Sequence, residues 1–162
     1  MTVSPSPIAD AAGARLLIIE SPYYAEIAAG LRRGALHEIA AAGASHEVVR
    51  VGGSFELPGA IRIAIRASAA GRAAFDGYVA LGCVIRGETD HYDHIARETA
   101  RGLMDLSIQF GVPVAFGVLT VHHYDQAAAR AQVPPAGGWE HNKGREAARA
   151  ALGQVALARR FG

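Results

Sequence analysis

Apolar segments alternate with amphipathic segments along most of the chain, and this alternation limits the possible folds more than any other feature. A strand of a parallel sheet is covered on both faces and is apolar throughout, whereas the helix that follows it is apolar on one side only. Segment 15–20 (RLLIIE) has the first pattern, and segment 23–42 has the second. Within the latter, Ile27, Leu31 and Ile39 recur at helical spacing. The alternation therefore predicts consecutive βαβ units.

The same patterns predict four strands and five helices. Strands are expected at 15–20, 46–51, 76–85 and 112–119. Helices are expected at 23–42, from Ser54 to about 70, and at 91–110, 124–131 and 140–161. Gly43 is expected to stop the first helix and Ser54 to cap the second, where Pro58 is tolerated in the first turn. Right-handed crossovers then give an α/β three-layer sandwich, with a four-stranded parallel sheet between helices.

The composition fits a single globular domain. Of the 162 residues, 51% are hydrophobic and 19% are charged, and a formal net charge of +1 gives no reason to expect nucleic acid or a membrane as partner. No apolar run approaches the roughly 20 residues of a membrane span. The one cysteine, Cys83, rules out an internal disulfide and suits a reducing compartment. We therefore expect a cytoplasmic protein with one domain at 14–162, preceded by an N-terminal arm at 1–13 that lacks the pattern of a signal peptide.

The loop after the third predicted strand carries the clearest chemical signal. It reads RGETDH from Arg86 to His91 and leads into a predicted helix. Gly87 can adopt backbone angles that other residues avoid, and the first amide groups of a helix have no helical partner. These donors and the helix dipole favour an anion such as phosphate. Because a histidine titrates near neutral pH, His91 could transfer protons beside that anion.

Ligands of open parallel sheets bind outside the carboxyl ends of the strands. This rule selects four loops, at 21–24, 52–56, 86–91 and 120–124. They supply aromatic rings and the carboxylate of Glu56, a combination that suits a flat heteroaromatic substrate. Phe116, inside the fourth strand, would add a ring if the pocket lay at a sheet edge or a subunit boundary.

Several residues have two interpretations. His91 could be an acid/base or a helix-start histidine paired with a carboxylate. Arg86, Arg130 and Lys143 could bind phosphate or be solvated surface charges. Cys83 is interpreted as a small buried residue, since no base is evident beside it. Asp90, His91, Asp93 and His94 are potential metal ligands, but they lack the HExxH spacing, so a metal site is not expected. GxGxxG, Walker A and GxSxG motifs are absent.

Five motifs occur in a characteristic order. They are GSFELP (53–58), GCVIRGETDHYD (82–93), FGVLT (116–120), QAAARA (126–131) and NKG (142–144). In these motifs the chain resembles the lumazine synthases, from about residue 15 to residue 162. The resemblance implies a flavodoxin-like sheet of order 2-1-3-4. It also implies a transferase that condenses 5-amino-6-(D-ribitylamino)uracil with 3,4-dihydroxy-2-butanone 4-phosphate. The products would be 6,7-dimethyl-8-ribityllumazine, phosphate and water, in the penultimate step of riboflavin biosynthesis. By the same resemblance, the reaction would require neither a metal nor an organic cofactor.

The resemblance also implies roles for individual residues. His91 would transfer protons. Contacts to the aminouracil would come from Tyr23, Ser54, Phe55, Glu56, Cys83, Val84, Ile85 and Phe116. Contacts to the butanone phosphate would come from Gly87, Glu88, Thr89, Arg130 and Lys143. Pro22 departs from the family pattern beside the stacking ring, so Tyr24 is an alternative to Tyr23.

The resemblance further implies a site shared between subunits, with Phe116 and Arg130 supplied by a neighbour. Segment 132–141 is longer than the corresponding link in members that form sixty-subunit shells, so we expect a homopentamer, or two pentamers paired as a decamer. Two other functions compete with the transferase. One is a flavin- or lumazine-binding carrier without turnover, and the other is a metal-dependent enzyme that uses His91 and His94.

Overall fold

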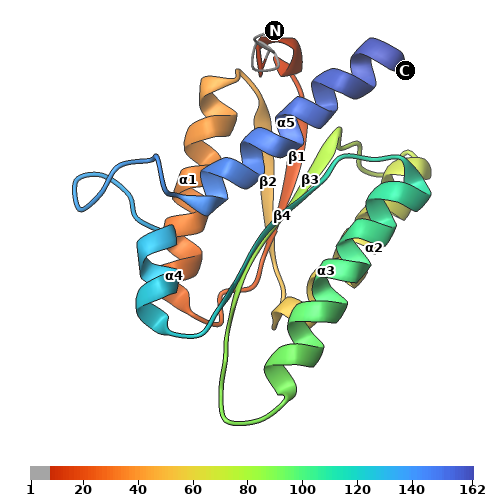
Figure 1. The fold of residues 1–162 in the computed structure, drawn as a ribbon. Helices are drawn as coiled ribbons and strands as arrows, with labels where there is room; N and C mark the ends of the chain where they lie inside the picture. The colour runs from red at the N-terminus through yellow and green to blue at the C-terminus, as the bar shows by residue number, and fades with distance from the viewer. Residues whose placement is uncertain (1–7) are drawn as a thin grey trace, which may run out of the picture.

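In the computed structural model, residues 8–162 are described, and they form one sheet between two layers of helices (Figure 1). The strands are β1 (Arg15–Glu20), β2 (Ser45–Arg50), β3 (Gly77–Ile85) and β4 (Val114–Val121). The α-helices are α1 (Ala25–Ala41), α2 (Leu57–Ala69), α3 (His91–Phe110), α4 (Tyr124–Arg130) and α5 (Lys143–Phe161). Two short 3-10 helices, η1 (Ile8–Ala11) and η2 (Ser54–Glu56), precede β1 and α2.

The strands pair in parallel in the order β2-β1-β3-β4. The predicted flavodoxin-like α/β sandwich is therefore confirmed. β1 and β3 occupy the centre of the sheet and are mostly buried, as expected for strands covered on both faces. β2 lies at one edge and is mostly exposed. β4 lies at the other edge, and several predicted site residues lie along it.

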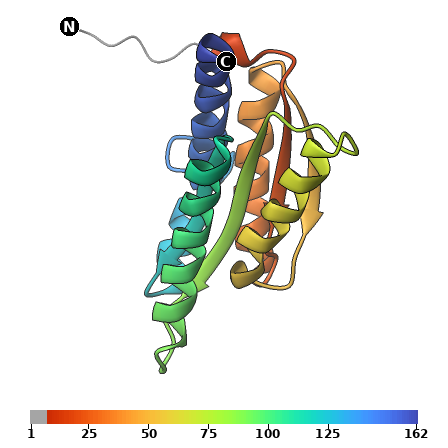
Figure 2. The same ribbon diagram turned by 90° about the vertical axis from the view of Figure 1, so that its right-hand side faces the viewer.

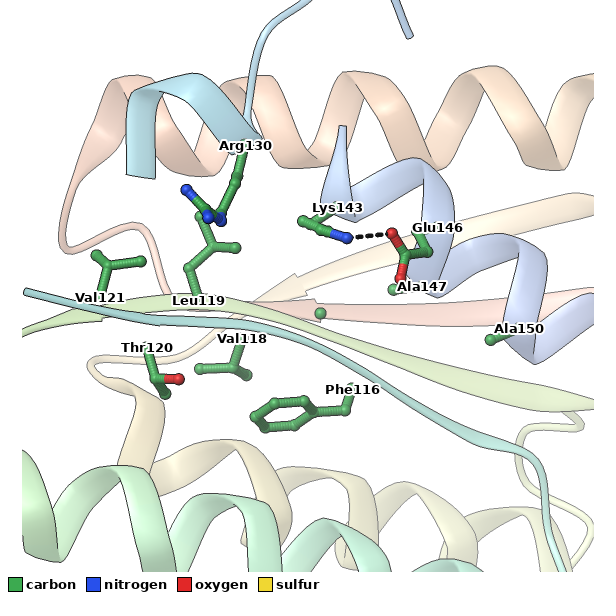
Figure 3. Close-up of a pocket in the computed structure, with 11 residues that line it drawn as sticks. Phe116, Val118, Leu119, Thr120, Val121, Arg130, Lys143, Glu146, Ala147 and Ala150 are labelled. Carbon is green, nitrogen blue, oxygen red and sulfur yellow. Dashed lines mark hydrogen bonds and ion pairs between the residues drawn. The ribbon is translucent and has the colours of Figure 1, made fainter. Parts of the chain in front are cut away.

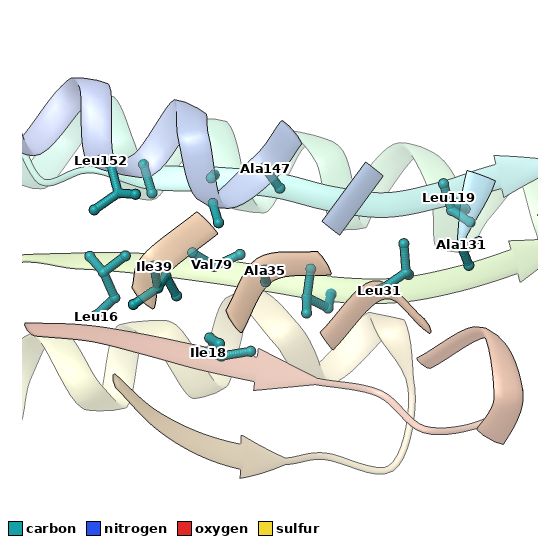
Figure 4. Close-up of a cluster of buried hydrophobic side chains, with 14 of the residues drawn as sticks. Leu16, Ile18, Leu31, Ala35, Ile39, Val79, Leu119, Ala131, Ala147 and Leu152 are labelled. Carbon is teal, nitrogen blue, oxygen red and sulfur yellow. The ribbon is translucent and has the colours of Figure 1, made fainter. Parts of the chain in front are cut away.

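Helices α1 and α5 cover one face of the sheet, and α2 and α3 cover the other (Figures 1 and 2). Successive residues of a strand point to opposite faces, so β1 contributes to two hydrophobic cores. Leu16 and Ile18 pack against α1 and α5 (Figure 4), whereas Leu17 and Ile19 pack against α2 and α3. Helices thus cover both faces of the sheet, and a site can form at the ends of the strands.

The backbones of α1 and α5 are in direct contact at Gly144. A Cβ atom at this position would lie 1.9 Å from the carbonyl oxygen of Leu31, a distance that no side chain can occupy. Glycine is therefore required at Gly144 by close packing. This contact fixes the start of α5, and with it Lys143, against α1.

Some predicted boundaries are wrong by two or three residues. α1 begins at Ala25 instead of Tyr23, and β4 spans Val114–Val121 instead of 112–119. α5 begins at Lys143 because the Asn142 side chain accepts a hydrogen bond from the Arg145 backbone N–H at 3.0 Å and so caps the helix. Ser54 was predicted to cap the second helix, but it begins η2 and its side chain makes no capping hydrogen bond.

Part of the predicted N-terminal arm packs on the domain. Ala11 of η1 is fully buried, and Arg159 of α5 donates hydrogen bonds of 2.9 Å to the carbonyl oxygens of Asp10 and Ala12. The remainder of the arm, residues 1–7, lies outside the described residues. Among the described helices, none has both the length and the apolar character needed to cross a bilayer.

Candidate active site

Most of the predicted site residues meet in one cavity of about 610 Å³ at the carboxyl ends of β1, β2 and β3. We call it the strand-end pocket. It is lined by Ser21, Tyr23, Tyr24, Gly52, Gly53, Ser54, Phe55, Glu56, Cys83, Val84, Ile85, Gly87, Thr89, His91, Tyr92 and Ile95. Its volume is suitable for a small organic ligand. Three of the four predicted loops contribute to it, at 21–24, 52–56 and 86–91.

The fourth predicted loop, 120–124, does not reach this pocket. β4 is an edge strand, and the chain leaves it toward α4, which packs on the α1 side of the sheet. The Tyr124 ring lies 6.3 Å from the Tyr24 ring, measured between centroids, but Tyr124 is not part of the pocket wall. The rule that selected four loops therefore holds for β1, β2 and β3, and not for β4.

The two candidate stacking rings differ in exposure. Tyr23 is 75% exposed, whereas Tyr24 is half buried and packs against the α1/α5 core. The rings lie edge to face, with centroids 5.0 Å apart and an interplanar angle of 73°. Burial raises the pKa of the Tyr24 hydroxyl above its usual value, and nearby Tyr23 and Cys83 add to the shift. Tyr24 is thus a packed part of the pocket wall, whereas the exposed ring of Tyr23 is available to cover a ligand.

Loop 52–56 is held in place by a buried hydrogen bond from α3. The Thr99 hydroxyl donates to the Ser54 carbonyl oxygen at 3.2 Å, and Thr99 is almost fully buried. This bond fixes the loop relative to the helix that begins with His91. The side chains of Phe55 and Glu56 remain exposed at the rim, where they can contact a ligand.

His91 is the first residue of α3 and is exposed on the pocket wall. Its backbone N–H makes a long contact, 3.4 Å, with the Thr89 hydroxyl. Gly87 lines the pocket too, but its φ lies outside the left-handed region, and a Cβ atom there would meet open space. The expectation that Gly87 provides unusual backbone angles is therefore wrong. Glu88 belongs to the same loop but does not line the pocket.

Cys83 is buried near the end of β3. Burial raises the pKa of its thiol to about 11, so the thiol is protonated at neutral pH. This agrees with its interpretation as a small buried residue instead of a nucleophile. Together with Val84 and Ile85, it forms the strand side of the pocket.

The remaining predicted site residues, Phe116, Arg130 and Lys143, line a separate cavity of about 340 Å³ along β4. We call it the edge pocket. Figure 3 shows the Phe116 ring on the side of β4 that faces α3, and Arg130 and Lys143 on the opposite side. Arg130 donates to the carbonyl oxygen of Gln126 at 2.9 Å, and Lys143 pairs with Glu146. A single chain therefore distributes the predicted residues over two pockets.

Besides Tyr24, the alternative stacking ring, five pocket residues were not named as site residues: Ser21, Gly52, Gly53, Tyr92 and Ile95. Ser21 and the two glycines do lie in loops that the strand-end rule selected. Ser21 follows β1 directly, so its position at a strand end was a usable signal. Tyr92 and Ile95 lie on the first turns of α3 near His91, at spacings that place residues on neighbouring parts of one helix surface. Within residues 8–162, no three or more His, Cys, Asp or Glu side chains are grouped to hold a metal ion, so the metal-dependent alternative has no ligand set there.

The chain is similar to known proteins over most of its length. Residues 13–159 match the profile of the family described as 6,7-dimethyl-8-ribityllumazine synthase. A protein of that name from Methylobacterium radiotolerans is 51% identical over 148 residues, which cover 91% of this chain and 84% of the relative. The Nitrobacter hamburgensis protein of the same name is 46% identical over 152 residues, covering 94% and 90%. "6,7-dimethyl-8-ribityllumazine synthase 1" of Rhizobium meliloti is 44% identical over 147 residues, covering 91% and 93%.

Proposed function

The chain belongs to the 6,7-dimethyl-8-ribityllumazine synthase family, and we propose that it forms this lumazine from 5-amino-6-(D-ribitylamino)uracil and 3,4-dihydroxy-2-butanone 4-phosphate. Membership makes the chain an enzyme of this type, acting on small molecules. The two named substrates, and the place of the reaction as the penultimate step of riboflavin biosynthesis, are part of the proposal. We also propose a cytoplasmic location, which suits the free thiol of Cys83.

The observation that carries the proposal is the content of the strand-end pocket. One cavity of about 610 Å³ combines the Tyr23 ring, the Glu56 carboxylate and the His91 imidazole. A planar pyrimidine needs a ring for stacking and polar groups for orientation, and the condensation needs a proton carrier. Ser54, Phe55 and the strand segment from Cys83 to Ile85 would supply the remaining aminouracil contacts.

The reaction needs no nucleophile from the protein. The 5-amino group of the aminouracil attacks the ketone carbon of the butanone phosphate, and water leaves as an imine forms. A proton then leaves the carbon beside the imine as the C–O bond to the phosphate breaks, so inorganic phosphate is released and an enol forms. Proton transfer converts the enol to a ketone. The ribityl-bearing nitrogen closes the second ring with loss of water. His91 would accept and return protons in these steps, which is typically worth about 10²- to 10⁴-fold in rate, and holding both substrates together would contribute much of the rest.

The phosphate would be held at the start of α3, with help from basic residues of the edge pocket. Gly87 and Thr89 line the strand-end pocket near the helix start, where the helix dipole favours an anion. Glu88 would contribute through its backbone N–H. Arg130 and Lys143 would neutralise the phosphate charge, but on one chain they face a different pocket.

We propose that a second copy of the chain completes the site. If the edge pocket of one subunit faced the strand-end pocket of its neighbour, Phe116, Arg130 and Lys143 would join the other site residues. Phe116 is 47% exposed, so its ring is accessible to a second chain. Met104 and Ile108, on α3, are also exposed, and they would be covered in a homopentamer or a pair of pentamers.

The function is tested by mixing the purified protein with both substrates and following lumazine absorbance. We expect turnover well above the uncatalysed rate. Binding of lumazine without turnover would instead support the carrier alternative.

The shared site is tested by mixing two variants that are each impaired in a different pocket, at a butanone phosphate concentration where both have low activity. His91→Ala damages the strand-end pocket, and Arg130→Ala damages the edge pocket. Subunits mixed after dissociation would form some sites with neither substitution, so part of the activity should return. No recovery in a mixture shown by native mass spectrometry to contain mixed oligomers would contradict a shared site. Light scattering should give about five or ten times the 16.9 kDa mass of one chain, and a megadalton particle would contradict the predicted assembly.

A further inference from the structure

Ser21 is an exception among the buried polar side chains. Within residues 8–162, its Oγ is the only buried side-chain nitrogen or oxygen that has no hydrogen-bond partner. Buried hydroxyl groups in folded proteins are nearly always paired, because an unpaired one has lost its hydrogen bonds to water. A polar group left in this state needs an explanation.

The neighbouring residue shows that the fold can satisfy polar groups at this strand end. Glu20 is fully buried, and its carboxylate accepts hydrogen bonds from Arg32 at 2.7 and 2.9 Å and from Arg50 at 2.8 Å. Those partners lie on α1 and β2. The Ser21 backbone is also satisfied, since its N–H donates to the Leu81 carbonyl oxygen at 2.9 Å. Only the Ser21 hydroxyl is left unpaired.

The position of Ser21 connects this hydroxyl to the ligand site. Ser21 directly follows β1, is 3% exposed and lines the strand-end pocket. It lies beside Gly82, where a Cβ atom would come within 3.7 Å of the Ser21 Cβ and 2.8 Å of the Ser54 Oγ. Glycine at position 82 therefore allows the Ser54 hydroxyl to lie close to β3, next to Ser21.

We propose that the Ser21 hydroxyl binds a polar atom of the aminouracil substrate at the floor of the strand-end pocket. This inference rests on the proposed function. A serine hydroxyl can both donate and accept, and rotation about one bond moves it between three staggered positions. Ser21 and the neighbouring Ser54 are uncharged, whereas the anionic substrate is matched by the basic residues of the edge pocket and by the start of α3. The uncharged, polar aminouracil is thus the better match.

If Ser21 stabilised the fold, Ser21→Ala would lower stability. If its hydroxyl binds a ligand, the substitution should raise stability and weaken binding. A protein loses stability when a residue that stabilises its fold is replaced by alanine. Ser21→Ala removes an unpaired buried hydroxyl, so we expect the melting temperature to rise by about 2–4 °C. At the same time, the dissociation constant for the aminouracil should rise about three- to tenfold, because one hydrogen bond is lost. The KM for the butanone phosphate should stay the same.

The matched control is Ser68→Ala. The Ser68 hydroxyl is half buried and paired with the Tyr78 hydroxyl at 3.2 Å, at the opposite end of β3 from the pocket. This variant should lose stability and keep the aminouracil affinity of the wild type. Ser21→Cys keeps the shape of the side chain but is a poor hydrogen-bonding group, so it should resemble Ser21→Ala in affinity.

The experiment is calorimetric titration of the full-length protein and these variants with 5-amino-6-(D-ribitylamino)uracil, beside thermal unfolding. Wild-type affinity in Ser21→Ala, or in Ser21→Cys, would overturn the inference even if the enzyme turns over. Absence of turnover by the wild type would instead contradict the proposed function. The two failures are therefore distinguishable.

Discussion

Arg86, the first residue after β3, donates a hydrogen bond from Nη2 to Oδ1 of Asp93 in the first turn of α3, at 2.7 Å. The Arg86 guanidinium also lies 4.7 Å from the centre of the Tyr92 ring. These contacts bridge the loop that carries Gly87 and Thr89 and leads to His91. The bridge thus joins the end of a rigid strand to the start of the helix that presents the imidazole.

We expect Arg86→Ala to lower turnover about tenfold with little change in stability. The pair is half exposed, so its loss should change the free energy of unfolding by less than about 1 kcal/mol. A small displacement of His91 is costly for catalysis, however. The control is Arg101→Ala. Arg101 lies on α3, and its replacement removes similarly exposed ion pairs with Glu98 and Asp105. Equal loss of turnover in both variants would show that the effect comes from the helix as a whole.

His91→Ala should lower kcat about 10²- to 10⁴-fold. Because the pocket wall is otherwise unchanged, calorimetry should still detect aminouracil binding. His94→Ala serves as the control, since His94 is exposed on the same helix and does not line the pocket. If binding and turnover were lost together, His91 would be a binding residue and not a proton carrier.

Arg130→Ala should raise the KM for the butanone phosphate more than tenfold and leave aminouracil binding intact, since a guanidinium contributes mainly to anion binding. The comparison variant is Arg72→Ala. Arg72 lies in the turn between α2 and β3, at the end of the sheet opposite the strand-end pocket. Steady-state kinetics with each substrate varied in turn would separate the two effects. A change in the aminouracil KM alone would contradict the assignment.

Two glycines of α5 should respond to alanine in opposite directions. Gly144→Ala places a Cβ atom 1.9 Å from the Leu31 carbonyl oxygen, so α1 and α5 must separate, at an expected cost of about 1–3 kcal/mol or more. Gly153 has open space around its Cβ position, and alanine there should stabilise the helix by about 0.5–1 kcal/mol. Urea denaturation measures both. Similar effects at the two positions would contradict the close contact at Gly144.

The Cys83 thiol should react slowly in the folded protein. Its pKa is raised from 9.0 to about 11 by burial, so at pH 8 the thiolate fraction is far lower than in the unfolded chain. Stability should also fall as pH rises from about 9 toward 11, because only the unfolded state then ionises this group. Cys83→Ala should not show this part of the pH dependence. Rapid modification of the native protein by a thiol reagent would contradict the burial.

The sequence by itself was sufficient to predict the sheet, its parallel pairing, the helical layers and the three loops of the strand-end pocket. Apolar periodicity is a local property, and it records directly which faces of a strand or helix are buried. The strand 76–85, followed by a glycine-containing polar loop and then His91, could be recognised for the same reason. The five motifs were also sufficient to suggest the family.

Only the tertiary structure decided how those residues are distributed in space. Phe116, Arg130 and Lys143 line a separate pocket because α4 and the start of α5 lie along β4, at the edge of the sheet opposite β2, and this arrangement depends on long-range packing. The same packing leaves Gly87 with ordinary backbone angles and Ser21 with an unpaired hydroxyl beside Gly82. Such facts depend on which segments meet, and the local pattern of a sequence does not contain that information.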